Sequence, residues 1–341
     1  MEEPVTVLLV PPFLLKRKMQ KVVRRFLSCS LFFILPVVTT PAAEWSLEQT
    51  DNGYQINIDG KLFAGYRTDF KGTPILWPII GPTAQEMTRS YPMAPQGKPS
   101  EKTDHPHHRS LWFNHGNVNG EDFWTITSSV IKHKRFVKAD KDAQGVILVT
   151  ENEWIGKNGD ILCTDQRTFR FGLNGESRLI DFDVTVTAVA DRVVFADTKE
   201  GCFGVRVPGR FDGDKDRKDK ERPGGTIVNA EGLKGDEAWG KRSPWVDYSG
   251  ELENGDVVGI TILNHPSSFR YPTYWHVRTY GLFAANPFGV HDFVKGGKSD
   301  AGALTIRKGD SFSLRYRVVL HTGTTESIDL TKMFEEYSAL P

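Results

Sequence analysis

The chain of 341 residues carries equal numbers of basic and acidic side chains, 43 of each. Because electrostatic binding of nucleic acid requires a basic face, this balance argues against a nucleic-acid-binding protein. Hydrophobic residues make up 39% of the chain and aromatic residues 11%, which is typical of a globular protein with a large core.

Residues 1–43 have the layout of an N-terminal extension and a secretory signal peptide. Basic residues at 16–25 precede an apolar run at 26–38, and small residues suited to cleavage follow at 39–43. Met19 is a second candidate start. We expect cleavage and a secreted or periplasmic protein. The alternative is an uncleaved anchor, but the run is shorter than the roughly 20 residues of a spanning helix, and no later stretch is long enough to span a bilayer.

The remainder, 44–341, is predicted to be a single domain of β structure. Residues 180–188 and 311–318 alternate apolar and polar side chains, as half-buried strands do. Further strands are expected at 146–154, 160–171 and 257–263. Asn-Gly and Asp-Gly pairs supply tight turns at 52–53, 59–60, 158–159, 174–175 and 254–255. The pattern predicts an all-β fold, a large antiparallel β-sandwich.

The segment 104–116 concentrates groups that can do chemistry near neutral pH. It contains His105, His107, His108, Arg109, Asn114 and His115, and Asp122 and Trp124 follow it closely. One hypothesis is general acid–base catalysis. In it, His107 or His108 transfers a proton and Arg109 holds an anionic or hydroxyl-rich group. Asn114, Asp122 and Trp124 are then candidate substrate-binding residues.

The same histidines permit a second hypothesis, a site for one divalent metal ion. His105 and His107 form an H-x-H pair, and His115 or an acidic neighbour would complete the ligand set. A third possibility is that the histidines only brace a long loop. The sequence does not decide among the three.

Two loops follow. Residues 211–223 mix both charges with one apolar side chain, which predicts a solvated insertion. Residues 229–245 are rich in Gly and Trp. There, Trp239 is a candidate for stacking on a sugar ring, and Glu231 and Lys241 are candidates for binding its hydroxyls. The alternative is a structured loop that caps a sheet end.

If residues 274–280 form a strand, alternation places Tyr274, His276 and Arg278 on one face, and Tyr280 extends it. We expect His276 to be a second proton-transfer group and Arg278 to hold the substrate. Trp275 is a second candidate for stacking, and Asn286 for substrate binding. The alternative is a polar outer face.

A helix is predicted at 325–339, where apolar residues form a stripe. Cys163 and Cys202 lie in no CxxC motif, and we expect both to be free and buried rather than bridged. The sequence contains no Walker loop, dinucleotide fingerprint, G-x-S-x-G or H-E-x-x-H motif, so no nucleotide cofactor is expected.

Several of these segments resemble one bacterial family. They are 87–93, the Asp-His-Pro-His-His-Arg block at 104–109, 119–124, 231–242 and 275–289. The family is often labelled "PmoA family" or "methane oxygenase PmoA" and is common in planctomycetes and other polysaccharide-degrading bacteria. The resemblance implies a secreted, β-rich protein of unassigned activity, with genomic neighbours that act on sugars. The genuine methane monooxygenase subunit is an integral membrane protein, whereas this chain is hydrophilic, with a mean hydropathy of -0.38.

Taken together, the residues and the resemblance predict a carbohydrate-active protein. The sandwich is expected to resemble the supersandwich of galactose mutarotases. The leading hypothesis is an enzyme that uses His and Arg for acid–base chemistry on a sugar. The alternatives are a metal-dependent enzyme and a non-catalytic carbohydrate-binding or cell-surface module. Partners beyond a small polar substrate, and the oligomeric state, are left open.

Overall fold

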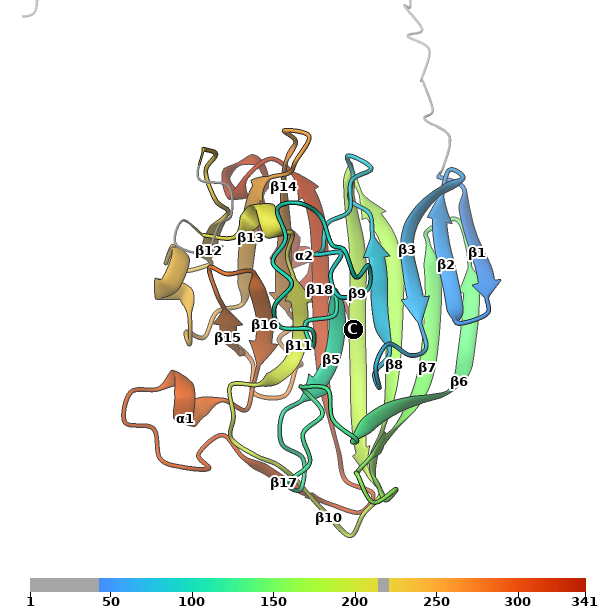
Figure 1. The fold of residues 1–341 in the computed structure, drawn as a ribbon, viewed down its shortest axis with the longest axis vertical. Coiled ribbons are helices and arrows are strands. Elements are labelled where there is room, and N and C mark those ends of the chain that lie inside the picture. Colours follow the sequence, from blue (N-terminus) through green and yellow to red (C-terminus); the bar gives the residue numbers. More distant parts are fainter. Residues whose placement is uncertain (1–42, 214–220) are drawn as a thin grey trace, which may run out of the picture. The chain divides into compact units, whose positions relative to one another are not determined.

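Two large antiparallel sheets account for most of the structure, a computed structural model that describes residues 43–213 and 221–341 (Figure 1). The predicted signal peptide, except for Ala43, lies outside the described residues, as does 214–220 of the predicted insertion. Among the described residues, no helix is both long enough and apolar enough to cross a bilayer.

Sheet 1 contains, in spatial order, β1 (Trp45–Thr50), β2 (Gly53–Ile58), β3 (Lys61–Arg67), β4 (Ile75–Ile79), β5 (Leu111–His115), β11 (Gly201–Arg206), β16 (Leu282–Asn286) and β15 (Tyr274–Val277). Sheet 2 contains β12 (Thr226–Asn229), β13 (Trp245–Glu251), β14 (Val257–Asn264), β18 (Ser311–Thr322), β9 (Ser177–Ala188), β8 (Ile161–Asn174), β7 (Val146–Ile155) and β6 (Val130–Lys141). A separate ribbon pairs β10 (Arg192–Phe195) with β17 (Leu304–Arg307).

Among the residues that the structure describes, helices are few and short. They are α1 (Val290–Phe293), α2 (Leu330–Ser338) and the 3-10 turns Gly209–Phe211, Gly235–Ala238 and Thr325–Ser327. The helix predicted at 325–339 is confirmed in its second part only. Its true start is fixed by Asp329, whose side chain accepts a hydrogen bond from the Lys332 amide and caps the first turn.

The predicted strands and hairpins are confirmed. Burial alternates residue by residue along β7, as expected for a strand with one face in the core. The turn between β2 and β3 uses Asp59 (φ 50°) and Gly60 (φ 70°), the pair of positive angles that an Asp-Gly hairpin turn requires. The all-β, antiparallel prediction therefore holds, because local pattern and turn chemistry agree.

Aromatic side chains of the two sheets interlock to form the core. Phe63 of β3 packs edge-on against Phe171 of β8 at 5.6 Å between centroids, and Phe203 of β11 stacks on Tyr316 of β18 at 4.9 Å. One ion pair is enclosed in this apolar layer, between Asp165 and Arg167 of β8. Cys163 and Cys202 are both free and buried, as predicted.

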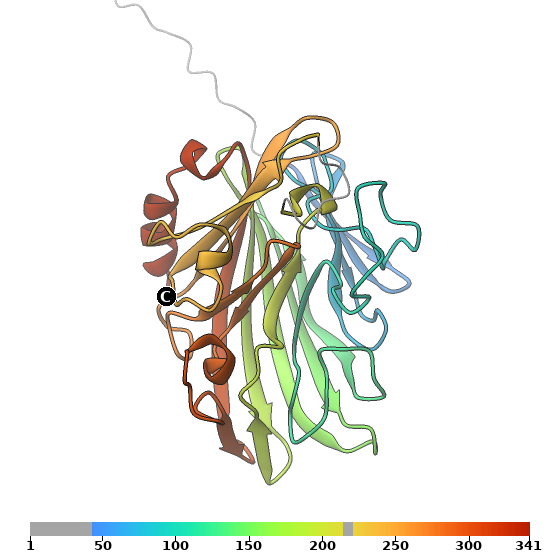
Figure 2. The ribbon, with the colours of Figure 1, turned by 60° about the vertical axis from the view of Figure 1, so that its left-hand side comes forward.

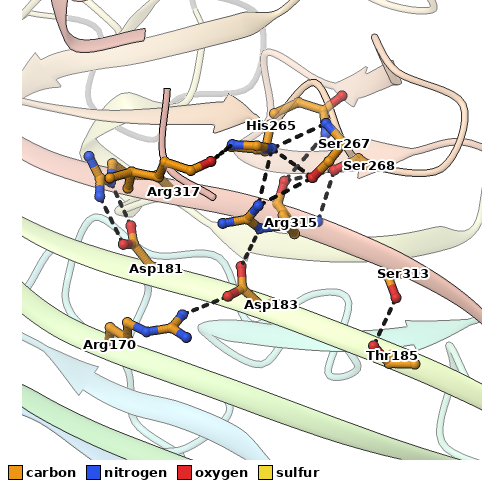
Figure 3. Close-up of polar contacts among 12 residues, drawn as sticks. Arg170, Asp181, Asp183, Thr185, His265, Ser267, Ser268, Ser313, Arg315 and Arg317 are labelled. Carbon is orange, nitrogen blue, oxygen red and sulfur yellow. Dashed lines mark hydrogen bonds and ion pairs between the residues drawn. The ribbon is translucent and has the colours of Figure 1, made fainter. Parts of the chain in front are cut away.

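The outer face of sheet 2 is an ordinary solvated surface with paired charges (Figure 3). Arg317 binds Asp181, and Arg315 and Arg170 both bind Asp183, at 3.2 and 2.6 Å. Elsewhere on this face, α2 covers an apolar patch through Leu330, Met333 and Tyr337.

The outer face of sheet 1 is covered differently. The segment that joins β4 to β5, residues 80–110, runs over it and pairs with β11 through the Arg89 amide and the Arg206 carbonyl, 2.9 Å apart. Figure 2 shows this segment and α2 on opposite sides of the sandwich. Residues 80–110 therefore bring the predicted histidine segment onto a sheet face.

Candidate functional site

Strand alternation selects which side chains reach the outer face of sheet 1. In β5, Phe113 packs in the core whereas Trp112 belongs to a separate cluster on the opposite face. In β11, Val205 is in the core and Arg206 points outward to His108. The outer face therefore receives Trp112 from β5 and Arg206 from β11, beneath the histidine segment.

Four nearly parallel rings form the centre of this face. His108 stacks on Trp112 with 5.5 Å between centroids and 16° between planes, and His105 stacks on His108 at 4.9 Å and 13°. Tyr280 stacks on His105 at 5.3 Å and 10°. Trp124 lies edge-on to His108 at 6.1 Å. We refer to His105, His108, Trp112, Trp124 and Tyr280, together with the neighbouring Arg89 and Arg206, as the histidine–arginine cluster.

Gly204 of β11 gives Trp112 its place in the cluster. A Cβ atom at Gly204 would lie 2.6 Å from Cζ2 of the Trp112 indole. Gly204→Ala is therefore expected to displace Trp112 and the stacked His108, change the near-ultraviolet circular dichroism, and cost about 1–3 kcal/mol of stability. The matched control is Gly172→Ala in β8, where the new Cβ would meet only the Gln144 carbonyl at 3.6 Å. Equal spectra for the two variants would contradict the role of Gly204.

Arg206 fixes the protonation state of His108. Its guanidinium donates to Nδ1 of His108 at 3.0 Å, so the ring accepts there and its remaining proton lies on Nε2. Burial, together with the charge of Arg206, holds the pKa of His108 well below its usual range. His108 is therefore a neutral donor at pH 7 and does not fit the predicted role of proton shuttle.

Asp104 anchors the two arginines behind the rings. Arg89 binds it at 2.7 Å, and Arg206 approaches it at 3.7 Å. Burial acts to raise the pKa of Asp104, but Arg206, His105 and Arg89 together outweigh it, and the pKa is lowered. Arg89 also donates to the carbonyl oxygens of Asp104 and His105, which orders the histidine segment.

Asp212 is a buried carboxyl beside Arg206. It is 1% exposed, and neither of its side-chain oxygens has a hydrogen-bond partner among the described residues. Burial raises its pKa to about 7, against the opposing charges of Arg206 and Lys102. The predicted solvated insertion is therefore wrong at its first residues, because Phe211 is in the core and holds Asp212 inside.

A second group continues the cluster from Tyr280. The guanidinium carbon of Arg278 lies 5.6 Å from the ring centroids of both Tyr280 and Trp239. The Trp239 ring lies edge-on to His276 at 6.3 Å. The predicted strand 274–280 ends at Val277, and a turn from Arg278 to Gly281 brings Tyr280 back over the sheet.

His276 offers one free ring nitrogen. Its Nδ1 lies 2.9 Å from the Lys199 carbonyl oxygen, which can only accept, so Nδ1 carries the proton and Nε2 carries a lone pair. Burial lowers its pKa to about 4, and Arg278 and Lys199 contribute in the same direction. His276 is therefore neutral at pH 7 and has the form of a base.

His107 is a second neutral histidine, and neither of its ring nitrogens is committed to a described residue. It is partly exposed, packs edge-on to His108 at 4.5 Å, and makes no hydrogen bond to a described residue. Burial, His105 and Arg109 lower its pKa to about 4. Of the two histidines predicted for catalysis in 107–108, His107 is the one with free nitrogen atoms.

The proposed metal ligands are not brought together, which corrects that hypothesis. His115 points into the core, where its Nε2 lies 2.9 Å from the Ala196 carbonyl and its Nδ1 lies 3.4 Å from Sγ of Cys202. His105 and His107 lie on the other side of the sheet. No group of three potential His, Cys, Asp or Glu ligands occurs within 43–213 and 221–341.

Two more predicted substrate contacts are corrected by their burial. Trp275 lies between Tyr274 and His276, so it must face the core, where it is 0% exposed and donates to the Ser243 carbonyl. Asn286 is also 0% exposed. Its side-chain amide donates to the Thr198 carbonyl and accepts from the Phe288 backbone amide. Neither side chain can touch a substrate.

The residues predicted around the turn at 122–125 support the cluster from behind. Asp122 accepts the amides of Trp124 and Thr125, and Asn114 donates to the Phe123 carbonyl at 2.6 Å. Arg109 is 1% exposed and donates to the Thr125 carbonyl, so it braces this turn and does not hold an anion beside Arg278.

Three other predicted residues lie at or beyond the edge. Tyr274 is on the outer face but packs on Phe293 of α1, 5.6 Å away. Glu231 is exposed near Tyr271, which stacks on Phe334 of α2, so it is not part of the cluster. Lys241 is exposed, and its side chain forms no hydrogen bond or ion pair with the residues described.

Sequence reasoning missed Arg206 and Asp212. For Arg206 a signal existed, because Phe203 and Val205 alternate with Gly204 and Arg206 and so place the arginine opposite the apolar side chains. For Asp212 the run of mixed charges concealed the signal. Only the packing of Phe211 reveals it.

A hollow of about 400 Å³ on sheet 2 is a competing site. Its lining includes Lys138, Arg170, Asp181 and Arg317 but no histidine. Three of these side chains are engaged in the ion pairs of Figure 3, and Lys138 lies 3.7 Å from Asp140. We assign the candidate site to the histidine–arginine cluster, which holds the groups able to move a proton.

A family model matches residues 53–335, and the chain therefore belongs to the family of unknown function DUF6807. This is compatible with the resemblance carried by the motifs, although the description of the model contains no PmoA label. No curated protein matches the sequence significantly.

Solved structures with a similar arrangement are distant. The α-galactosidase of Lactobacillus brevis aligns with a TM-score of 0.40 at 10% identity, over 83% of this chain and 40% of its own. An α-galactosidase of Geobacillus stearothermophilus gives 0.37 at 12% identity, over 82% and 41%. The protein Slr1438 of Synechocystis gives 0.32 at 11%, over 84% and 97%. This chain spans about two fifths of the length of these galactosidases. At such similarity the neighbours assign no activity.

Proposed function

We propose that this protein binds a sugar on the outer face of sheet 1 and acts on it by proton transfer. The observation that carries the proposal is the continuous contact from His105 and His108 through Tyr280, Arg278 and Trp239 to His276. Segments far apart in the sequence thus supply ring faces, a guanidinium and neutral imidazoles to one place.

Each type of side chain matches one part of a sugar. The Trp239 and Tyr280 rings are partly exposed and offer apolar faces to the C–H side of a pyranose, while neighbouring donors serve its hydroxyls. His276, with its lone pair on Nε2, is proposed as the base. His107 is proposed as the second proton-transfer partner, because its nitrogen atoms are uncommitted. We do not propose a metal site formed by His105, His107 and His115, because the structure does not bring these three side chains together.

The test begins with a panel of mono- and oligosaccharides, with binding followed by the shift in unfolding temperature and turnover by proton NMR. For any substrate found, His276→Ala is expected to lower kcat/KM by about 100-fold or more, because the base is removed. His265→Ala is the matched control. His265 is also buried and bonds a backbone carbonyl, that of Leu340, but it lies on sheet 2.

Unchanged turnover in His276→Ala would exclude the proton-transfer role. Binding without turnover by the wild-type protein would instead identify a carbohydrate-binding module. A wild-type protein that neither binds nor converts any sugar would contradict the proposal as a whole.

A further inference from the structure

Arg278 differs from the arginines that the fold uses for structure. Arg315 and Arg317 bind carboxylates, and Arg242 and Arg270 donate to backbone carbonyls. The guanidinium of Arg278 donates no hydrogen bond and forms no ion pair within the described part of the chain, although it is only partly exposed. Within residues 43–213 and 221–341, no carboxylate or carbonyl oxygen satisfies this cation.

The two rings beside Arg278 hold it in place without neutralising it. Trp239 and Tyr280 each lie 5.6 Å from its guanidinium carbon, a distance at which a cation is attracted to an aromatic face. The edge donors of a planar guanidinium remain available for a bidentate contact when its face packs on a ring. Arg278 is thus oriented in advance, which lowers the entropy lost when a ligand binds.

Three of the carboxylates around Arg278 make contacts elsewhere. Asp104 binds Arg89 at 2.7 Å, and Asp292 accepts the Lys199 amide at 2.9 Å. Glu200 lies 3.5 Å from Lys199. None of these three carboxylates pairs with Arg278, so its guanidinium can bind an anion supplied by a ligand, and guanidinium geometry suits a carboxylate or a sulfate ester.

Resting on the proposed function, we propose that the sugar bound at this site carries an anionic substituent, which Arg278 recognises. The substituent is a carboxylate, as in a uronic acid, or a sulfate ester. His276 lies two residues before Arg278 on the same face and shares its contact with Trp239. Arg278 would therefore hold the anion beside Trp239, the ring that His276 also contacts.

Calorimetry tests this with D-glucuronate, D-galacturonate, D-galactose 6-sulfate, D-glucose and D-galactose. Wild-type protein is expected to bind at least one anionic sugar more than tenfold tighter than its neutral counterpart. Arg278→Gln is expected to weaken that binding about 10- to 100-fold and to weaken binding of the neutral counterpart by a smaller factor, because the charge-assisted contact is made only with the anionic sugar. The carboxylate and sulfate arms identify which anion the site takes.

Arg242→Gln is the matched control, because Arg242 also lies over a ring, 5.5 Å from Tyr274, but its guanidinium is already bound to backbone carbonyls. This variant is expected to bind the anionic sugar as wild type does. A second readout is the pKa of His276 measured by NMR. It is expected to rise when the anionic sugar binds, since the positive charge of Arg278 is then offset.

Equal affinity for neutral and anionic sugars would overturn the inference and leave the proposed function intact. Tight binding of the anionic sugar by Arg278→Gln would overturn it as well, as would an equal loss in Arg242→Gln. If acetate or inorganic sulfate bound as tightly as the corresponding sugar, the ligand would be a simple anion and the inference would fail. Failure of every sugar to bind would contradict the proposed function itself.

Discussion

Replacing Arg167 by methionine is expected to destabilise the protein by about 3–5 kcal/mol, because it leaves a carboxylate buried without its counter-charge. Asp165 is 2% exposed between the two sheets. Arg167 donates to both of its oxygens, at 2.9 and 2.8 Å, and only the neutral side chains Asn152 and Trp154 complete the site. Arg167 also donates to the Phe113 carbonyl of sheet 1 and so links the two layers.

Urea unfolding measured by far-ultraviolet circular dichroism gives the free energy of unfolding of each variant. The informative comparison is the double variant Asp165→Asn with Arg167→Met. It is expected to recover at least half of the loss, because the uncompensated charge is gone while an oxygen remains for Trp154. If the free energy of unfolding of Arg167→Met alone stayed within about 1 kcal/mol of wild type, the ion pair would not matter for stability.

Asp212→Asn is expected to change how stability depends on pH. Because the pKa is raised from 3.8 to about 7 in the folded protein, the neutral form is favoured by folding. Protonated Asp212 makes its full contribution to the free energy of unfolding below about pH 4, and this contribution is lost as the pH rises through 7. The difference between the two pKa values corresponds to about 4 kcal/mol of stability, which is lost once Asp212 is fully ionised.

The asparagine variant cannot ionise, so it escapes this loss. Its stability relative to wild type is expected to increase by about 2–3 kcal/mol between pH 5 and pH 8. Urea unfolding at a series of pH values measures the change. Asp51→Asn, an exposed aspartate in the β1–β2 turn, is the control and should keep a constant difference. A constant difference for Asp212→Asn too would mean that Asp212 is ionised throughout this range.

The architecture was accessible from the sequence because it depends on local signals. Alternation in β9 and β18 and the Asp-Gly turn at 59–60 each contain their information within a few residues. The pairing of β5 with β11 and of β11 with β16 was not accessible, because no local pattern specifies which distant strands meet.

The same distinction explains the candidate site. His107, His276 and Arg278 could be predicted as candidates because unusual residue types gather in short segments. His115 was misassigned because proximity in sequence says nothing about which face of β5 a side chain takes. Trp275 was misassigned although alternation with His276 already placed it on the other face. Asp212 was hidden because its burial depends on Phe211 and not on the charges around it.

The order of strands in sheet 1 governs when the candidate site comes into existence during folding. In sheet 2, β6, β7, β8 and β9 pair in sequence, so each new hairpin closes a short loop. In sheet 1, Phe203 pairs with Phe113 on one side and with Ala285 on the other, and both loops are long. Closing long loops is entropically costly and slow. The site is therefore expected to assemble after the hairpins of sheet 2, because His105 and His108 must wait for Arg206, His276 and Arg278, which follow them far along the chain.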